Sequence, residues 1–391
     1  MKLSSYVTGM VGGEETDAWA IHSNAQNRRR SGEDLLLLSI GDHDFTTDRR
    51  IVDAAVNSLR AGNHHYTPSI GFQYLREAVA EFHARVIGEV VGPANVAITP
   101  GAQSGVFAAA QCLLDPGDEV LGFDPMYVTY MDALEARGAR VIILPLFAED
   151  GFLPDPDRIR AAVSSRTKAI MLNTPNNPTG VVYPRETLEA LASICVEHDL
   201  WLISDEVYCT MCFDTPHLSP RLLEDMAERT IGVYSLSKSH AMTGFRMGWM
   251  VGSEPVIQAA GDVMGSMMFG TAPFIQDAAN AALTSAVDVV DMVRDRYRQR
   301  RDLICDALEA LPKINIRRPS AGMFLMIDIR GTGWDAIDFA WKLLEEQRLA
   351  LLPGEGFGKQ LAGHLRLSYG ASDEDLTDAA CRLSAFLQKN G

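Results

Sequence analysis

The chain has 391 residues, of which 47% are hydrophobic and 22% are charged, and these proportions exclude a disordered protein. Its length exceeds what one hydrophobic core usually holds, so two or three domains are expected. The net charge of −16 disfavours a nucleic-acid-binding surface, because such a surface needs a local excess of basic side chains. The densest basic cluster, Arg28 to Arg30, is interpreted as a solvated helix end.

The N-terminus lacks the apolar segment of a secretory signal, and no later window offers about 18 uncharged apolar residues. We therefore expect a soluble, cytosolic protein. Six cysteines are too sparse for a disulfide scaffold at this size. Cys209 and Cys212 form a C-x-x-C motif without a second Cys or His pair at metal spacing, so we interpret them as structural and expect no metal site.

Candidate strands alternate with helical patterns from about residue 94 to residue 255. The strands are expected at residues 95–100, 119–124, 140–146, 168–175, 200–208, 231–237 and 248–253. Apolar positions at helical spacing lie between several of them, as in residues 186–199. The pattern predicts an α/β fold with a mostly parallel seven-stranded sheet between helices, and ligands bind beyond the carboxyl ends of such strands.

After residue 253 the pattern changes to a long charged helix, expected at residues 286–311, followed by two short strands and further helices. We expect a large α/β domain over residues 46–290 and a smaller α+β domain made of residues 1–45 and 291–391. The first 45 residues are assigned to the smaller domain because they precede the strand and helix alternation. A substrate site between the two domains is expected.

Polar motifs follow four of the predicted strands. GAQSG (101–105) opens a helix, and backbone N–H groups at a helix start favour an anion. NNPTG (176–180), DEVY (205–208) and SLSK (235–238) lie at the ends of three further strands. Together they predict an anion cradle, an Asn, an Asp, a Tyr and a Lys on one edge of one sheet.

The motifs GAQ, DPMYVTY, NTPNNPTG, DEVY, SLSKSHAMTGFRMGW and HLRLSYG resemble, in order and spacing, those of the class I aminotransferases, which are fold type I pyridoxal-phosphate enzymes. The resemblance covers nearly the whole chain and is greatest to bacterial arginine–pyruvate aminotransferases. It implies pyridoxal 5'-phosphate as the cofactor, bound by the large domain. It also implies a homodimer with a shared active site and a ping-pong transfer from an L-amino acid to a 2-oxo acid such as pyruvate or 2-oxoglutarate.

The resemblance also implies roles for single residues. Lys238 would be the catalytic amine, which forms a Schiff base with the cofactor aldehyde and moves the α-proton of the substrate. Asp205 would pair with the pyridine nitrogen and keep the ring an electron sink. Tyr208 and Asn177 would donate hydrogen bonds to the phenolic oxygen of the ring, and Tyr127 would stack on its face.

The same resemblance implies how the two anionic groups are held. Arg366 in HLRLSYG would grip the substrate α-carboxylate, helped by Asn177 and by the backbone near Gly41. Tyr66 in HHYTPSIG would reach the phosphate of the neighbouring subunit. The residues implied to hold the phosphate within one chain are Gly101, Ala102, Gln103, Ser235, Ser237 and Arg246.

Two departures from the family pattern bear on the substrate. His43 stands where the common pattern GDPDF has proline, and it is either a titratable group near the substrate or an exposed loop histidine. Gln103 stands where some acid-selective relatives carry a lysine, and residues 265–274 supply methionines and a phenylalanine. These features disfavour an aspartate side chain, so arginine is the donor hypothesis. Candidate partners for its guanidinium are Asp42, Asp44, Glu14, Glu15 and Asp17.

Three other functions stay open at this point. An aminotransferase could act on aspartate, alanine or aromatic amino acids. A pyridoxal-phosphate-dependent carbon–sulfur lyase would share the cofactor residues and differ in the bond that breaks. A non-enzymatic ligand-sensing module is disfavoured, because no helix-turn-helix extension precedes the domain and the net charge is acidic.

Overall fold

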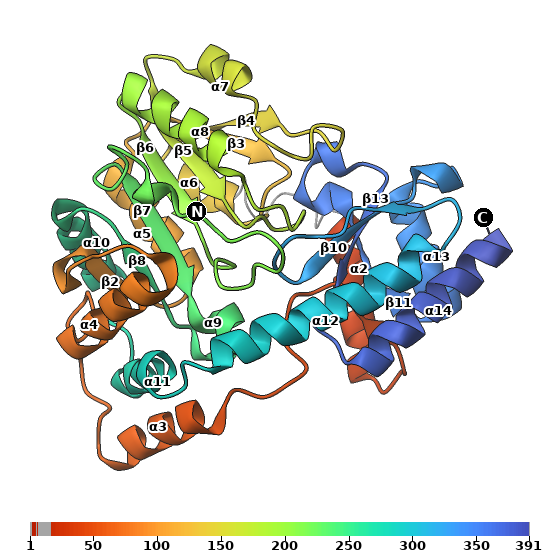
Figure 1. Ribbon diagram of the computed structural model, residues 1–391, viewed down its shortest axis with the longest axis horizontal. Coiled ribbons are helices and arrows are strands. Elements are labelled where there is room, and N and C mark those ends of the chain that lie inside the picture. The colour runs from red at the N-terminus through yellow and green to blue at the C-terminus, as the bar shows by residue number, and fades with distance from the viewer. Residues whose placement is uncertain (1, 5, 7–16, 391) are drawn as a thin grey trace.

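A seven-stranded sheet with helices on both faces forms the centre of the larger part of the molecule (Figure 1). The computed structural model describes residues 2–4, 6 and 17–390. The strand order is β2-β8-β7-β6-β5-β3-β4, and β8 is antiparallel to its neighbours β2 and β7 while the other neighbours pair in parallel. The strands are β2 (Val96–Thr99), β3 (Glu119–Asp124), β4 (Arg140–Pro145), β5 (Thr167–Asn173), β6 (Trp201–Asp205), β7 (Thr230–Ser235) and β8 (Gly248–Val251). The prediction of a mostly parallel seven-stranded sheet is confirmed.

Successive residues of the central strands point to opposite faces of the sheet, and both faces are buried. In β5, Ala169 and Met171 pack in a cluster with α5, α6 and α10, whereas Ile170 and Leu172 pack in a second cluster with α7 and α8. This explains why the strands read as continuous apolar runs. The covering helices are α5 (Ala102–Leu113), α6 (Tyr130–Glu135), α7 (Pro156–Ala162), α8 (Arg185–Glu197) and α10 (Glu254–Met268).

Four predicted strands run two or three residues past the observed ends of β5, β6, β7 and β8, and for two of them the structure shows the cause. β6 ends at Asp205 and not at residue 208, because the Asp205 carboxylate accepts the backbone N–H of Val207 and turns the chain. β7 ends at Ser235 and not at residue 237, because the Ser235 side chain caps the short helix α9 (Leu236–Ser239). Both errors fall where a polar side chain satisfies the next backbone donor and so ends the strand.

A second sheet lies at the other end of the long helix α12 (Val289–Glu309), which runs from the large sheet toward it in Figure 1. This sheet is antiparallel, in the order β12-β13-β10-β9. Its strands are β9 (Asn315–Ile316), β10 (Phe324–Asp328), β12 (Leu352–Pro353) and β13 (His364–Ser368). The N-terminal part of the chain joins this end, because β1 (Leu36–Leu37) pairs in parallel with β11 (Leu349–Ala350). The domain boundaries at residues 46 and 290 stay a prediction.

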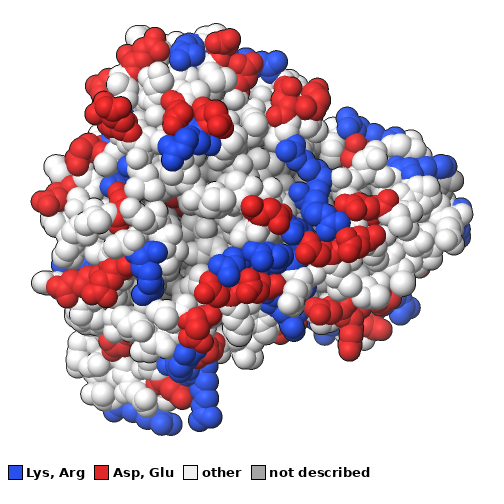
Figure 2. All heavy atoms as spheres, in the orientation of Figure 1, with Lys and Arg blue, Asp and Glu red and all other residues white. Residues whose placement is uncertain are grey.

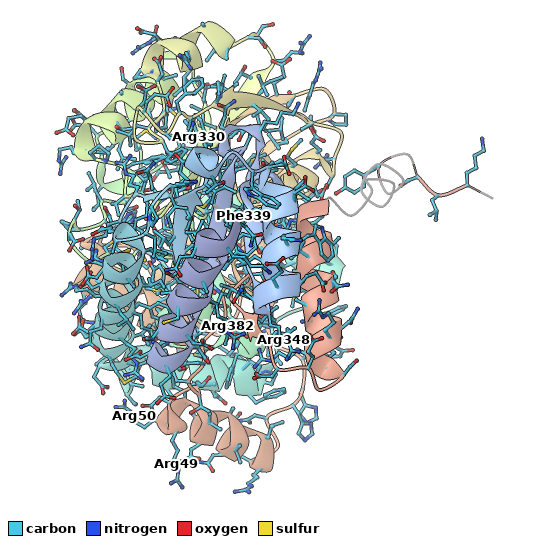
Figure 3. The ribbon with its side chains drawn as sticks, turned by 90° about the vertical axis from the view of Figure 1, so that its right-hand side faces the viewer. Arg49, Arg50, Arg330, Phe339, Arg348 and Arg382 are labelled. Atoms are coloured by element: carbon cyan, nitrogen blue, oxygen red, sulfur yellow. The ribbon has the colours of Figure 1, made fainter. Side chains whose placement is uncertain are left out.

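Three helices cover the second sheet: α2 (Asp17–Arg30), α13 (Ala336–Gln347) and α14 (Asp373–Asn390). Figure 3 shows them side by side, with the fully buried Phe339 of α13 facing α14, where its ring lies 4.7 Å from that of Phe386. The helix end predicted at Arg28 to Arg30 is confirmed, and Arg28 is ion-paired with Glu33 and Glu345. Acidic and basic side chains are interspersed over the face in Figure 2.

The remaining helices are α3 (Arg49–Arg60), α4 (Gln73–Phe82) and α11 (Pro273–Thr284). Short 3-10 or π turns lie at residues 83–87, 93–95, 220–222, 243–245, 330–332, 354–357 and 359–361. In the part of the chain that the structure describes, no helix is long and apolar enough to cross a membrane. The cytosolic location expected from the sequence stays a prediction.

Candidate active site

The carboxyl ends of β5, β6 and β7 form one edge of the sheet, called here the carboxyl rim, and Lys238 lies on it. Lys238 belongs to α9, the turn that directly follows β7, and its Nζ donates to the Gly41 carbonyl at 2.6 Å. Burial lowers the pKa of Lys238 to about 8, with Asp42 opposing the shift and Arg366 and Arg246 adding to it. Roughly a tenth of this amine is therefore neutral at pH 7, where an ordinary lysine is almost fully charged.

Asp205 ends the neighbouring strand β6 and is buried. Its Oδ2 accepts the hydroxyl of Tyr130 at 2.5 Å, and its Oδ1 accepts the backbone N–H of Val207 at 3.1 Å. Burial raises the pKa of Asp205 to about 6, although both hydrogen bonds favour the ionised form. Since no basic side chain of the described residues pairs with this carboxylate, it is suited to receive a cation.

Tyr130 is a site residue that sequence reasoning missed. It lies three positions after Tyr127 in DPMYVTY, and the two rings meet edge to face with centroids 5.7 Å apart. It begins α6, its side chain is buried, and its hydroxyl reaches Asp205 at the end of β6. The spacing to Tyr127 was the available signal, because residues three apart share a face of a helical turn.

The start of α5 forms the expected anion cradle. Gly101 precedes it with φ +82°, a left-handed conformation that side chains disfavour, and a Cβ there would collide with the guanidinium of Arg246. Gly248 lets β8 pass close to the start of α5, since a Cβ on Gly248 would lie 2.9 Å from the backbone nitrogen of Ala102. The N–H groups of Ala102 and Gln103 belong to the first turn, which has no intrahelical acceptor for them. Arg246 therefore lies where these donors and its own charge can meet one anion.

Ser235, Ser237 and Gln103, which the sequence also assigned to this cradle, take different positions in the structure. Ser235 Oγ donates to the Met247 carbonyl and accepts the N–H of Ser237, both at 3.0 Å. Ser237 Oγ accepts a long hydrogen bond of 3.5 Å from Arg246. The Gln103 side chain turns away, since its Oε1 accepts the Thr129 hydroxyl at 2.6 Å. Ser235 thus shapes the turn, while Ser237 lies beside the guanidinium.

Arg366 lies in β13 and is only 2% exposed. Its guanidinium is sandwiched between the rings of Phe324 and Phe357, with its carbon 3.9 and 4.2 Å from their centroids. It donates to Asn177 Oδ1 at 3.1 Å and to the Ser39 carbonyl at 2.8 Å, while its Nε is buried without a partner. No carboxylate of the described residues pairs with it, and burial lowers its pKa to about 9. A buried, uncompensated cation is costly unless an anion binds it.

The remaining ring-contact residues lie between these charges. Tyr208 is buried, and burial raises its pKa, with Tyr127 adding to the shift and Arg366 opposing it. Arg366 lowers and Asp205 raises the pKa of Tyr127 as they do that of Tyr208, so the charges of Arg366 and Asp205 both act on these two hydroxyls. The structure therefore brings the predicted residues of one chain together, from the sheet on one side and from β13 on the other.

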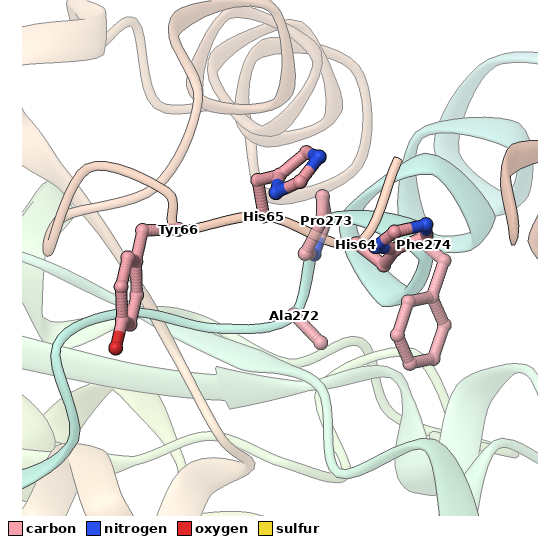
Figure 4. Close-up of a pocket in the computed structure, with 6 residues that line it drawn as sticks. All are labelled: His64, His65, Tyr66, Ala272, Pro273 and Phe274. Carbon is pink, nitrogen blue, oxygen red and sulfur yellow. The ribbon is translucent and has the colours of Figure 1, made fainter. Parts of the chain in front are cut away.

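Tyr66 does not join this group within the same chain. It is 86% exposed, and its ring lies against that of Phe269, which is 65% exposed, with centroids 5.1 Å apart. It lines a shallow pocket of about 280 Å³ with His64, His65 and the start of α11 (Figure 4). The expectation that it reaches a neighbouring subunit stays a prediction.

The acidic residues expected to bind the guanidinium of an arginine substrate differ in whether another side chain already occupies them. Asp44 is occupied by Arg300, which donates to both of its oxygens at 2.7 Å. Asp42 accepts the Thr243 hydroxyl at 3.0 Å and lies close enough to Lys238 to raise its pKa. Asp17 begins α2, and Glu14 and Glu15 lie outside the described residues.

His43 and the cysteine pair are also placed. His43 is not an exposed loop side chain: its ring is partly buried and hydrogen-bonded on both nitrogens. Cys209 and Cys212 are free thiols whose pKa values burial raises, so they are poor nucleophiles. Among the described residues, no group of His, Cys, Asp and Glu could hold a metal ion.

A family profile described as "Aminotransferase class I and II" matches residues 33–383. The chain belongs to this family. The aminotransferase is 45% identical to the arginine–pyruvate transaminase of Pseudomonas aeruginosa, over 98% of each chain, and 38% identical to the aspartate/prephenate aminotransferase of Thermus thermophilus, over 94% of this chain and 95% of the relative.

Among the solved structures that match this fold are aminotransferases as well. A single mutant of the Thermus thermophilus aspartate aminotransferase superposes with a TM-score of 0.92 at 38% identity, covering 99% of this chain and all of that one. This aminotransferase thus moves an amino group between an amino acid and a 2-oxo acid, in a family that depends on pyridoxal phosphate. A lyase reaction is not favoured, and the ligand-sensing alternative is wrong, because the matching relatives are transaminases.

Proposed function

We propose that this aminotransferase binds pyridoxal 5'-phosphate at the carboxyl rim and transfers the amino group of L-arginine to a 2-oxo acid such as pyruvate, by a ping-pong mechanism. One observation supports this most strongly. Two cationic groups, the partly buried Lys238 and the buried Arg366, donate to carbonyls of the same segment, those of Gly41 and Ser39. An amino acid fits between them with its carboxylate on Arg366 and its amine toward Lys238.

The residues present fit the cofactor. Asp205 is a buried carboxylate without a basic partner among the described residues, as a protonated pyridine nitrogen requires. Arg246, Ser237 and the start of α5 offer a fork and several N–H donors, as a phosphate dianion requires. When bound, the cofactor supplies an aldehyde that condenses with amines and a ring that accepts electrons from the α-carbon.

The side chains of this protein would then do four things. Lys238, with its lowered pKa, provides a neutral amine that can attach the cofactor and later accept the α-proton. Arg366 orients the substrate by binding its carboxylate, and Asn177 fixes the guanidinium from the other side. Asp205 holds a proton on the ring nitrogen. The half-buried Tyr127 and the buried Tyr208 would limit the access of water to these groups.

Three observations favour arginine as the amino-group donor. The Pseudomonas aeruginosa relative at 45% identity carries arginine and pyruvate in its name, whereas the Thermus thermophilus relative at 38% is an aspartate/prephenate enzyme. In addition, Gln103 is neutral and bonded to Thr129, so it offers no cation to an acidic side chain. Asp42 gives the neighbourhood of Lys238 a negative charge.

A homodimer is the second part of the proposal. Tyr66, Met267 and Phe269 are apolar or aromatic side chains exposed at 86%, 45% and 65%. Exposed groups of this size are typical of an interface that buries them. A second copy of the chain would cover them and bring its own Tyr66 toward the phosphate site.

The visible absorption spectrum of the protein loaded with pyridoxal phosphate tests the proposal. Adding arginine alone, without a 2-oxo acid, should bleach the yellow band, and adding pyruvate should restore it. A tenfold preference for aspartate or an aromatic amino acid would overturn arginine as the donor and leave the transferase in place. Release of pyruvate and ammonia without an acceptor would instead indicate a lyase.

A further inference from the structure

His43 connects two parts of the molecule that are far apart in the sequence. Its Nε2 lies 3.1 Å from the carbonyl oxygen of Ser237, the residue before Lys238. Its Nδ1 lies 2.9 Å from the hydroxyl of Tyr297, a fully buried residue of α12. The ring also packs edge-on against Tyr297 and at a tilt against Phe45.

The two partners determine the tautomer of His43. The Ser237 carbonyl can only accept, so Nε2 must carry the proton and donate it. Nδ1 is then an acceptor, and the Tyr297 hydroxyl donates to it. The neutral ring thus makes one bond as a donor and one as an acceptor, and both need the imidazole in this single orientation.

The segment that His43 fixes contacts both cations of the site. The Gly41 carbonyl accepts Lys238 Nζ at 2.6 Å, and the Ser39 carbonyl accepts Arg366 Nη2 at 2.8 Å. Gly41 also lies against Phe324, which stacks on Arg366, and a Cβ on Gly41 would collide with that ring. A shift of this segment would therefore move the partners of the amine and of the guanidinium together.

We propose that His43 is a positioning residue: by linking α12 to the turn that carries Lys238, it holds residues 39–43 in place and so fixes the distance between the amine and Arg366. Proline, the residue of the common family pattern at this position, has no side-chain nitrogen that could make either bond. The connection between Tyr297 and the Ser237 carbonyl therefore depends on the histidine that this chain has at position 43.

The charges around His43 are consistent with a permanently neutral ring. Burial, with Lys238 adding to it, lowers the pKa of His43 to about 4, although the Ser237 carbonyl, Asp42 and Asp44 act in the opposite direction. Tyr297 faces the ring from α12, and Arg300 of the same helix is paired with Asp44. The ring therefore keeps its two hydrogen bonds over the whole range from pH 5 to 8.

The amine of Lys238 reports the position of the segment, and it can be titrated in the full chain without cofactor. We would label the protein with acetic anhydride across a pH series and quantify the Lys238 peptide by mass spectrometry, with the exposed Lys168 as internal standard. In His43→Phe, which keeps an aromatic ring but no hydrogen bond, we expect the Lys238 midpoint to rise by about one pH unit as water reaches the amine. The Lys168 midpoint should stay unchanged.

Three further variants distinguish the loss of the His43 hydrogen bonds from a general effect on packing. His43→Gln keeps an N–H that can reach the Ser237 carbonyl, so it should restore at least half of the shift. Tyr297→Phe removes one bond and should give a smaller rise, while Tyr183→Phe, a matched change at a buried tyrosine of another cluster, should give none.

An unchanged Lys238 midpoint in a folded His43→Phe protein would overturn the proposal, as would an equal shift in His43→Gln. If His43→Phe does not fold, unchanged midpoints in both His43→Gln and Tyr297→Phe would overturn it. The role is additional to the proposed function, and the titration needs no cofactor or substrate. Its failure is therefore distinguishable from a failure of the arginine assignment.

Discussion

The two halves of the site are built in different ways. On the carboxyl rim some of the contacts come from neighbours in sequence: Asp205 bonds to Val207, and Arg246 donates to the Thr243 carbonyl at 2.7 Å, although Tyr130 and Gly41 also reach Asp205 and Lys238 from distant segments. Arg366 instead bonds to Asn177 and Ser39, which lie 189 and 327 positions away in the chain. Local turns thus contribute to the half that fits the cofactor, whereas both hydrogen bonds of Arg366 in the half that fits the substrate come from the tertiary fold.

This difference has an experimental consequence. Changes on the carboxyl rim should alter the cofactor and its chemistry, whereas changes around Arg366 should alter substrate affinity and leave the cofactor in place. Four substitutions test the separation.

Replacing Lys238 with Ala should have the largest effect. The variant should still bind pyridoxal phosphate through the phosphate cradle but lose turnover by about 1,000-fold or more, because no positioned amine moves the α-proton. Steady-state transamination and cofactor retention on gel filtration measure the two properties. Lys168→Ala, on the opposite edge of the sheet, is the matched control, and normal turnover by Lys238→Ala would refute its assigned role.

Asp205→Asn should lower kcat by roughly 100-fold, which corresponds to about 3 kcal/mol for breaking a buried charge pair. The amide retains the volume and an oxygen for Tyr130, so the fold should be kept. The affinity for the cofactor should fall as well, which equilibrium dialysis measures. If kcat is unchanged, the carboxylate does not act on the ring nitrogen.

Arg366→Leu should raise the KM for the amino acid by about 10- to 100-fold, because charge-assisted hydrogen bonds to the carboxylate are worth roughly 1.5–3 kcal/mol. Cofactor affinity should be unaffected, and this contrast with Asp205→Asn is the sharpest test of the two halves. Arg366→Lys keeps the charge without the planar fork and should recover part of the loss. Equal weakening of cofactor and substrate would contradict the separation.

Tyr130→Phe should have the smallest effect, less than about tenfold in kcat at neutral pH. The lost hydrogen bond favoured the ionised carboxylate, so the pKa of Asp205 should rise above about 6. Protonation as the pH falls would then begin at a higher pH, and the acid limb of cofactor affinity should move upward. If the acid side of the pH profile of cofactor affinity moves to lower pH or does not move, Tyr130 does not lower the pKa of Asp205.

The sequence predicted the local half of this molecule better than the distant half. The seven strands were found because buried parallel strands are continuous apolar runs, and Lys238 and Asp205 were found because they end such strands in recognisable motifs. Four strand ends were placed two or three residues too far, and for β6 and β7 the cause is that the side chains of Asp205 and Ser235 accept the backbone N–H groups of the next turn.

The contacts around Arg366 had no signal in the sequence. The Phe324 and Phe357 rings that sandwich the guanidinium, and the Ser39 carbonyl that accepts from it, come from separate segments that only the tertiary fold brings together. The same is true of the Tyr297 partner of His43, which lies 254 positions away. Periodicity and motif spacing carry information about residues that are close together in the sequence, so they cannot predict contacts between distant segments.

The antiparallel course of β8 has a further consequence. Because β7 and β8 run in opposite directions, residues 236–247 form one connection that starts and ends at the same edge of the sheet, and it carries both Lys238 and Arg246. Inserting or deleting a single residue there would displace one of them by up to about 3.5 Å relative to the other. Surface loops commonly absorb such changes in length. We expect this connection to vary between lineages by substitution alone, with its length held constant.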